Sequence, residues 1–253
     1  MPSGMVNRLL SASSPETRDA LLARAEHLTL EVKYPLIRPE QPIDYVYFLE
    51  TGVASMVLGD PTRPDQLIEV ATIGREGFVG VPLVLQTLVT PGNVFIQVPA
   101  AGYRVPADAF KEAAEADPAF QRLLLRYAHA TLMQAAQVAT CNRIHNINER
   151  AARWLLMARD RVDSDTFALT QEFLAQMLGV RRQAVNATAG ELQDAGLITY
   201  SRGMITIVNR PGLEQVACPC YRAIMDQFER VYAVNGVPTA FQPVTESEPI
   251  RAL

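Results

Sequence analysis

Three residues in the C-terminal half, Arg182, Gln183 and Asn186, have the types and the spacing to read the edges of DNA bases. An arginine can donate two hydrogen bonds to a guanine edge, and a glutamine or asparagine amide can pair with an adenine edge. Side chains three and four residues apart share one face of a helix, so these three would project together. We therefore predict that they contact bases. The alternative is that they are solvated polar side chains on a surface helix.

A second set of polar side chains is predicted to hold the DNA backbone. Hydroxyl, amide and guanidinium groups bind phosphate oxygens, and such contacts fix the position of a protein without reading sequence. This set flanks the base-reading residues on both sides and contains Thr170, Gln171, Arg181, Ser201 and Arg202.

The elements that would position both sets lie within residues 166–208. Apolar periodicity predicts two helices, over residues 171–178 and 182–195, and two short apolar runs follow at 197–200 and 204–208. The order helix, tight turn, helix, hairpin indicates a winged helix-turn-helix.

Four residues inside this segment support that interpretation. Thr170 is a favourable N-cap for the first helix. Ala175 is small enough to let the two helices cross closely, Gly179 permits a left-handed turn, and Val185 can fill the joint between the helices. Each match alone is weak, but together they make a specific signal.

The N-terminal half has the texture of an antiparallel β unit. After an expected helix over residues 16–28, short runs rich in Val, Ile, Tyr and Phe alternate with Gly, Pro and Asp. Strands of this length and spacing favour a roll or a sandwich. The expected strands are 28–32, 45–49, 54–58, 67–73, 94–98 and 103–105, and the expected turns are Gly52, Gly59-Asp60 and 91–93.

A long helix is expected over residues 118–142, after a short one over 107–115, because no glycine or proline interrupts it after Pro118. Small and apolar residues recur along it at intervals of four and three, which is the seam of a helix that meets another helix. We predict dimerisation through this face; the alternative is that it packs on its own β domain. The seam contains Leu124, Ala128, Thr131, Ala135, Val138 and Asn142.

The composition fits two globular domains. The 253 residues are 49% hydrophobic and 20% charged, and the net charge of −4 leaves room for a locally basic surface. We predict an α+β fold with an N-terminal antiparallel β-roll, a long dimerisation helix and a C-terminal winged helix-turn-helix. The expected boundaries are 1–117 for the β-roll sensor with its N-terminal helix, 118–143 for the dimerisation helix, 144–235 for the DNA-binding domain and 236–253 for a mobile tail.

The cellular setting is predicted from cysteine usage and hydropathy. Three cysteines provide no disulfide framework and suit a reducing cytosol. The N-terminus does not have the pattern of a signal peptide, and the most apolar stretch, 78–89, is too short to span a bilayer. We expect a cytoplasmic protein without membrane attachment.

The segment 169–198 (LTQEFLAQMLGVRRQAVNATAGELQDAGLI) resembles the DNA-binding motif of the Crp/Fnr family of bacterial transcription regulators. Residues 39–53 look like early strands of the family's cyclic-nucleotide-binding-like jelly roll. The resemblance covers about residues 30–210. It implies a homodimer that binds a two-fold symmetric operator in double-stranded DNA, and contact with RNA polymerase if the protein is an activator. It also places a possible ligand pocket at Gly74, Arg75, Glu76 and Gly77.

The sequence departs from the family in three places. Residues 88–96 lack the arginine that pairs with a cyclic phosphate, and a buried phosphodiester without a partner is costly, so cyclic AMP is not the expected effector. The alternative is a cyclic-nucleotide-responsive regulator with an altered pocket. No cysteine precedes Cys141, so the usual iron–sulfur ligation is unsupported. Ala187 and Gln183 stand where the family commonly has Arg and Glu, so the operator sequence does not carry over.

Particular residues argue against other functions. A metal-dependent enzyme on the β-roll, of the cupin kind, needs clustered histidines, and residues 29–105 contain none. A helix-turn-helix used only for protein docking fits poorly with exposed arginines at its tip. Cys218-Pro219-Cys220 without neighbouring ligands predicts no metal site, and His145 near the expected hinge is a surface histidine or a proton sensor. No cofactor or catalytic residue is predicted, and the effector is unknown.

Overall fold

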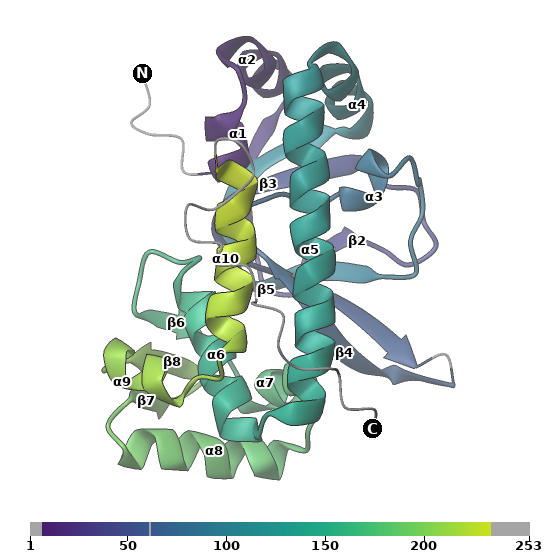
Figure 1. Ribbon diagram of the computed structural model, residues 1–253. Helices are drawn as coiled ribbons and strands as arrows, with labels where there is room; N and C mark the ends of the chain where they lie inside the picture. The colour runs from purple at the N-terminus through teal and green to yellow at the C-terminus, as the bar shows by residue number, and fades with distance from the viewer. Residues whose placement is uncertain (1–6, 61, 234–253) are drawn as a thin grey trace, which may run out of the picture.

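The computed structural model describes residues 7–60 and 62–233. In Figure 1 the N-terminal sheet lies along one side of the long helix α5 (Pro118–Ile144), and the C-terminal helices and small strands gather at the lower end of that helix. This is the α+β arrangement that the sequence predicts, with a β domain, a long helix and a helix-turn-helix in that order. Within the described ranges, no helix combines the length and the apolar character needed to cross a membrane.

Two short helices, α1 (Arg8–Ala12) and α2 (Pro15–Ala23), precede the sheet. The Ser14 hydroxyl caps α2 by accepting a hydrogen bond from the Thr17 amide, and Pro15 occupies the first helical position. The expected helix over 16–28 was too long by five residues at its C-terminal end. Its last residues belong to strand β1 (Glu26–Leu30), which pairs with β5.

The N-terminal sheet is antiparallel and follows the order β1-β5-β3-β4, with β2 (Pro35–Ile37) also paired to β5. The predicted strands 45–49 and 54–58 are one strand, β3 (Tyr45–Asp60). The predicted strands 94–98 and 103–105 likewise merge into β5 (Asn93–Pro106), while β4 (Arg63–Ile73) contains the predicted strand 67–73. Register shifts between β3 and β5 let these long strands bend without ending.

The predicted turn at Gly52 was wrong, because β3 continues through this residue. Gly52 has a φ of +93°, and an added Cβ would lie 2.4 Å from the Cβ of Ala100 on β5. The absence of a side chain at Gly52 therefore lets β3 and β5 approach closely where their register shifts. Glycine is common both in turns and at bends within strands, so the residue type alone does not tell the two apart.

Helices close the roll. The short helix α3 (Val81–Val84) follows β4, and α4 (Ala107–Ala116) follows β5. A chain of aromatic contacts through Phe48, Phe78, Phe110 and Tyr127 joins β3 to α4 and to the buried face of α5. The long helix is thus part of the core of its own β domain.

The C-terminal domain begins at α6 (Ile147–Arg159), which opens with a capping box: the Asn146 side chain accepts from the Glu149 amide, and the Glu149 carboxylate accepts from the Asn146 amide. Helices α7 (Gln171–Leu178) and α8 (Arg182–Asp194) follow, with a sheet of order β6-β8-β7. Its strands are β6 (Thr166–Ala168), β7 (Ile198–Ser201) and β8 (Met204–Ile207).

The last two helices return the chain to the β domain. After α9 (Arg210–Val216), helix α10 (Cys220–Tyr232) runs antiparallel to α5 and lies beside it (Figure 1). The rings of Phe228 and Tyr127 are 5.9 Å apart at this contact. The predicted tail 236–253 lies outside the described residues.

Candidate nucleic-acid interface and ligand cavity

The helix-turn-helix forms where the sequence predicts it. The Thr170 hydroxyl accepts a hydrogen bond of 3.1 Å from the Phe173 amide and so caps α7. Gly179 ends that helix in the left-handed conformation, with a φ of +64°. Val185 is completely buried and Ala175 nearly so, as expected for residues at the joint between the two helices.

Helix α8 has one buried and one exposed face. Val185, Thr188, Ala189 and Leu192 form the buried face. Arg182, Gln183 and Asn186 are all exposed at the N-terminal end of the helix, and Arg181 is exposed at its N-cap. Among the described residues, neither Arg181 nor Arg182 forms an ion pair. Their charge is therefore available to a partner.

The hairpin between β7 and β8 forms the predicted wing. Arg202 and Gly203 adopt consecutive positive φ angles of 51° and 77°, the conformation of a tight two-residue hairpin turn. The turn leaves Ser201 and Arg202 exposed beside the start of α7. There Thr170 is exposed and Gln171 half-buried. The predicted phosphate-binding residues thus border the exposed end of α8.

The predicted pocket residues Gly74, Arg75, Glu76 and Gly77 lie at the junction between the two domains and do not line the cavity described below. The Glu76 carboxylate and the Arg161 guanidinium form a buried ion pair of 2.7 Å. Arg161 also donates to the Thr72 hydroxyl and to the Met157 carbonyl, both at 3.0 Å. Arg75 pairs with Asp163 at 2.7 Å.

The two glycines of this segment make room for side chains from other elements. A Cβ added at Gly74 would lie 2.4 Å from the Arg161 side chain, and one added at Gly77 would lie 1.9 Å from the Tyr127 ring. The Tyr232 hydroxyl of α10 donates to the Glu76 carbonyl at 2.5 Å. Helices α5 and α10 and the segment that follows α6 therefore meet at one short loop.

A second contact joins the domains through a buried carboxyl group on β4. The Trp154 indole of α6 donates to Glu69 at 2.8 Å, and the Ser55 hydroxyl donates to the same carboxyl group. Burial raises the pKa of Glu69 from its usual 4.5 to about 7, although Ser55, Arg153 and Trp154 oppose the shift.

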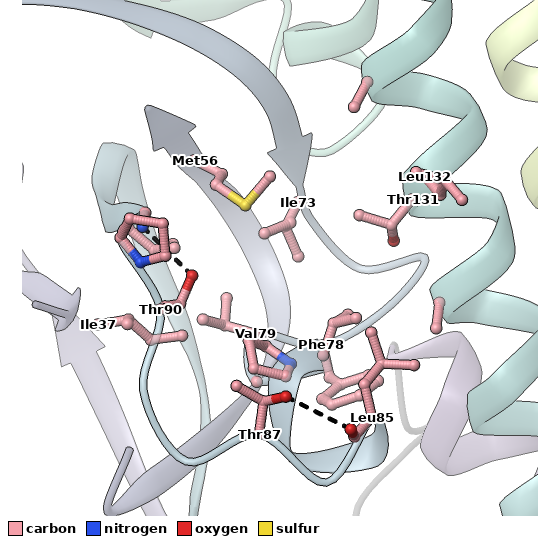
Figure 2. A pocket seen from close by; sticks show the side chains of 18 of the residues that line it. Ile37, Met56, Ile73, Phe78, Val79, Leu85, Thr87, Thr90, Thr131 and Leu132 are labelled. Carbon is pink, nitrogen blue, oxygen red and sulfur yellow. Dashed lines mark hydrogen bonds between the residues drawn. The ribbon is translucent and has the colours of Figure 1, made fainter. Parts of the chain in front are cut away.

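A cavity of about 580 Å³ lies between the roll and α5. Figure 2 shows Met56 and Ile73 of the sheet facing it, with Thr131 and Leu132 of α5 on the opposite side. Its lining is mainly apolar and includes no Arg, Lys, Asp or Glu among the described residues. The loop 73–80 contributes Ile73, Phe78, Val79 and Gly80. A hydrophobic cavity with few polar groups is typical of a small-molecule site.

The predicted dimer seam on α5 is occupied largely by the chain itself. Leu124 and Val138 are buried in the core, whereas Ala128, Thr131 and Ala135 line the cavity. The adjacent row of α5 has the same spacing and is exposed. This exposed row contains Leu125, His129, Leu132, Ala136, Ala139 and Arg143.

The fold also brings together three cysteines and one histidine from two distant parts of the sequence. Cys141 and His145, at the end of α5, lie beside Cys218 and Cys220, at the start of α10. The hydrogen bond with the Cys218 thiol lowers the pKa of Cys141. Nothing in the Cys-Pro-Cys segment alone pointed to this cluster, because the other two residues are more than 70 positions away in the sequence.

Comparison with known proteins identifies one domain of this chain from its sequence and finds solved structures with a similar fold. Residues 149–216 match the family model of the Crp-like helix-turn-helix domain. No curated protein matches the chain.

Among solved structures, a CRP-family transcriptional regulator from Thermus thermophilus matches with a TM-score of 0.62 and 16% identity, over 76% of this chain and 96% of the other. FixK2 from Bradyrhizobium japonicum matches with a TM-score of 0.60 and 17% identity, over 77% and 98%. The c-di-GMP-responsive regulator CLP of Xanthomonas campestris matches with a TM-score of 0.58 and 14% identity, over 77% and 99%. At these identities the likeness is one of fold.

Proposed function

We propose that this chain, which carries a Crp-like helix-turn-helix domain and has the fold of the Crp/Fnr regulators, is a sequence-specific DNA-binding transcription regulator. The observation that carries the proposal is the exposed N-terminal end of α8. Arg182, Gln183 and Asn186 project there, while the opposite face of the helix is held in the domain core. In helix-turn-helix proteins this end enters the major groove.

The neighbouring polar residues would fix the helix in the groove. Thr170 and Gln171 at the start of α7, Arg181 before α8, and Ser201 and Arg202 in the wing surround the base-reading face. Each presents a donor group suited to phosphate oxygens. Because phosphate contacts release counterions, binding should weaken steeply as salt concentration rises.

The regulator would act as a homodimer through the exposed row of α5. Leu125 and Leu132 are one heptad apart and are 46% and 62% exposed, which is unusual for leucines at this spacing on a helix. Pairing of two α5 helices would bury this row and present two copies of α8 to a two-fold symmetric operator. The half-sites would lie about one helical turn of DNA apart, roughly 34 Å.

Dimerisation would also complete the ligand cavity. Leu125, His129 and Leu132 of the exposed row belong to the cavity lining, so a second α5 would cover the opening. The apolar lining, which includes neither arginine nor lysine among the described residues, favours an apolar effector over cyclic AMP, whose phosphate needs a cation. We propose a cytoplasmic regulator that is not an enzyme, and that contacts RNA polymerase if it activates transcription.

The proposal is tested by the sequence preference of the purified full-length chain. Selection from a random duplex library should yield a two-fold symmetric site. Arg182→Ala should relax the preference at one base position in each half-site and cost about 1–3 kcal/mol in operator binding. Arg38→Ala, an exposed arginine on the roll without an ion pair among the described residues, is the matched control and should leave the preference intact.

Two outcomes would contradict the proposal. If Arg182→Ala weakened binding to all sequences equally, α8 would not read bases. If no sequence were enriched, the exposed end of α8 would serve another partner.

A further inference from the structure

A cysteine–histidine cluster, formed by Cys141, His145, Cys218 and Cys220, lies where α5 ends and α10 begins. The four ligand atoms, three thiol sulfurs and one imidazole nitrogen, all lie within 4.8 Å of one another. The Cys141 and Cys218 Sγ atoms are 3.4 Å apart, and Cys220 Sγ is 3.5 Å from His145 Nδ1. All three cysteines are buried.

These distances match a single tetrahedral ion. Zinc–sulfur bonds of about 2.3 Å and zinc–nitrogen bonds of about 2.0–2.1 Å place ligand sulfurs about 3.8 Å apart and sulfur and nitrogen about 3.6 Å apart. An iron–sulfur cluster with several irons needs its ligands spread around a larger body. Only a mononuclear site suits four atoms gathered this tightly.

We propose that Cys141, His145, Cys218 and Cys220 bind one zinc ion. Three thiolates and one imidazole fill all four tetrahedral positions, so the site is structural and leaves no position open for substrate. Soft sulfur ligands favour zinc over magnesium or calcium, which prefer oxygen.

The surrounding charges fit an anionic centre. Three thiolates and a zinc ion carry a net charge of −1. Arg150 and Arg153 of α6 are only 8% and 3% exposed, and within the described ranges neither forms an ion pair with a carboxylate. The Nε atom of each has no hydrogen-bond partner there. Both guanidinium groups are close enough to act electrostatically on Cys141.

A polar neighbour supports the same ligand set. The Gln137 amide, one turn before Cys141 on α5, donates to Cys220 Sγ at 3.1 Å. Hydrogen bonds of this kind orient ligands and stabilise thiolates in metal sites. This amide, together with the positive charge of the two buried arginines, would therefore stabilise a negatively charged metal centre.

The site would tie together the two sides of the inter-domain hinge. His145 is the C-cap of α5, and Asn146 is already the N-cap of α6. Cys218 and Cys220 hold the connection between α9 and α10, and the Cys218 amide also donates to the Glu149 carbonyl at 3.4 Å. A bound ion would fix the angle at which the DNA-binding domain leaves α5 (Figure 1).

The test uses the full-length chain, purified in a reducing buffer without chelator and freed of any polyhistidine tag. Elemental mass spectrometry should find about one zinc per chain. Metal removal with a chelator at low pH should lower the melting temperature by roughly 5–10 °C, and added zinc should restore it.

Cobalt substitution tests the ligands without a mutation. The chain contains only three cysteines, and all of them lie in the cluster. Thiolate-to-cobalt charge-transfer bands and strong visible bands of a tetrahedral ion would therefore assign the site directly. Cys218→Ser and His145→Ala should each lose the metal, whereas His129→Ala, at a histidine within α5 that is outside the cluster, should keep it.

Three results would overturn the proposal: zinc content far below one per chain with no cobalt bands, equal zinc in Cys218→Ser and the unmodified chain, or a Cys141–Cys218 disulfide in place of metal under cytosolic reducing conditions. Metal content is measured without DNA. Failure here is therefore distinct from failure of the proposed regulator function.

Discussion

At the scale of single residues, the domain junction depends on two glycines. Gly74 and Gly77 leave the space that the side chains of Arg161 and Tyr127 occupy. Gly77 faces the ring of Tyr127 so closely that a Cβ would overlap it. Gly190 on α8, in contrast, has no atom within 4 Å of an added Cβ. Gly77 and Gly190 therefore have opposite structural roles, and alanine substitution separates them.

We expect Gly77→Ala to destabilise the chain by about 1–3 kcal/mol, because the Tyr127 ring is fully buried and must move. Gly190→Ala is the control and should stabilise the chain by about 0.4–1 kcal/mol, since alanine suits a helix better. Urea denaturation of both variants measures the difference. Equal effects from the two substitutions would mean that the Tyr127 contact does not constrain the loop.

The buried carboxyl of Glu69 predicts a pH dependence. Its pKa in the folded chain is about 7, above the usual 4.5, so the folded state binds a proton that the unfolded state has released in this window. The contribution of Glu69 to the free energy of unfolding should therefore be complete at low pH. It should be lost as the pH rises from about 4.5 to 7, by about 3 kcal/mol in total.

Glu69→Gln removes the titrating group and should flatten the pH dependence of stability, measured by denaturation between pH 5 and 8. The exposed Glu115→Gln serves as the control and should keep the slope of the unmodified chain. If Glu69→Gln keeps that slope as well, the buried carboxyl is not its source.

At the scale of elements, the helix-turn-helix was predictable because its signals are local. The cap Thr170 and the left-handed Gly179 act within one turn of their partners, and Val185 is buried at the joint between two helices that follow each other in the sequence. The strands were predicted less well because Gly52 looks like a turn in the sequence. Only its pairing with β5 reveals that the strand continues.

The face of α5 was ambiguous for a different reason. Leu124 and Leu125 are adjacent, and both begin a row with the same intervals of four and three. Periodicity fixes the helix but not which of two neighbouring rows faces the core. That choice depends on how the roll packs, with Leu124 buried and Leu125 nearly half exposed.

Charge on the exposed row of α5 should prevent dimerisation. Leu132→Glu would place two carboxylates near the two-fold axis of the paired helices, so we expect a shift from dimer to monomer in analytical ultracentrifugation. Leu88→Glu changes an equally accessible leucine, 56% exposed, and is the matched control. A Leu132→Glu chain that stays dimeric would place the interface elsewhere.

At the scale of the whole molecule, the domain order was predictable and the contacts between domains were not. The pair of Glu76 and Arg161 joins residues 85 positions apart, and the Cys141–Cys218 contact joins residues 77 apart. Such contacts have no local sequence signature, because they depend on where separate elements are brought together. The family resemblance placed a possible ligand pocket at residues 74–77, whereas in the structure these residues lie at the junction between the two domains, with Glu76 paired to Arg161.

The return of α10 along α5 constrains how this molecule can move. The C-terminal domain is joined to the β domain at both of its ends, through the hinge at His145 and through the last turn of α10, where the Tyr232 hydroxyl donates to the Glu76 carbonyl. A wide swing about one pivot would break the second attachment, whereas a small sliding of α10 against α5 would preserve both. Phe78 lines the cavity and is two residues from Glu76, to which α10 is bonded. A ligand that fills the cavity would therefore act on the C-terminal domain by sliding α10 a short distance along α5.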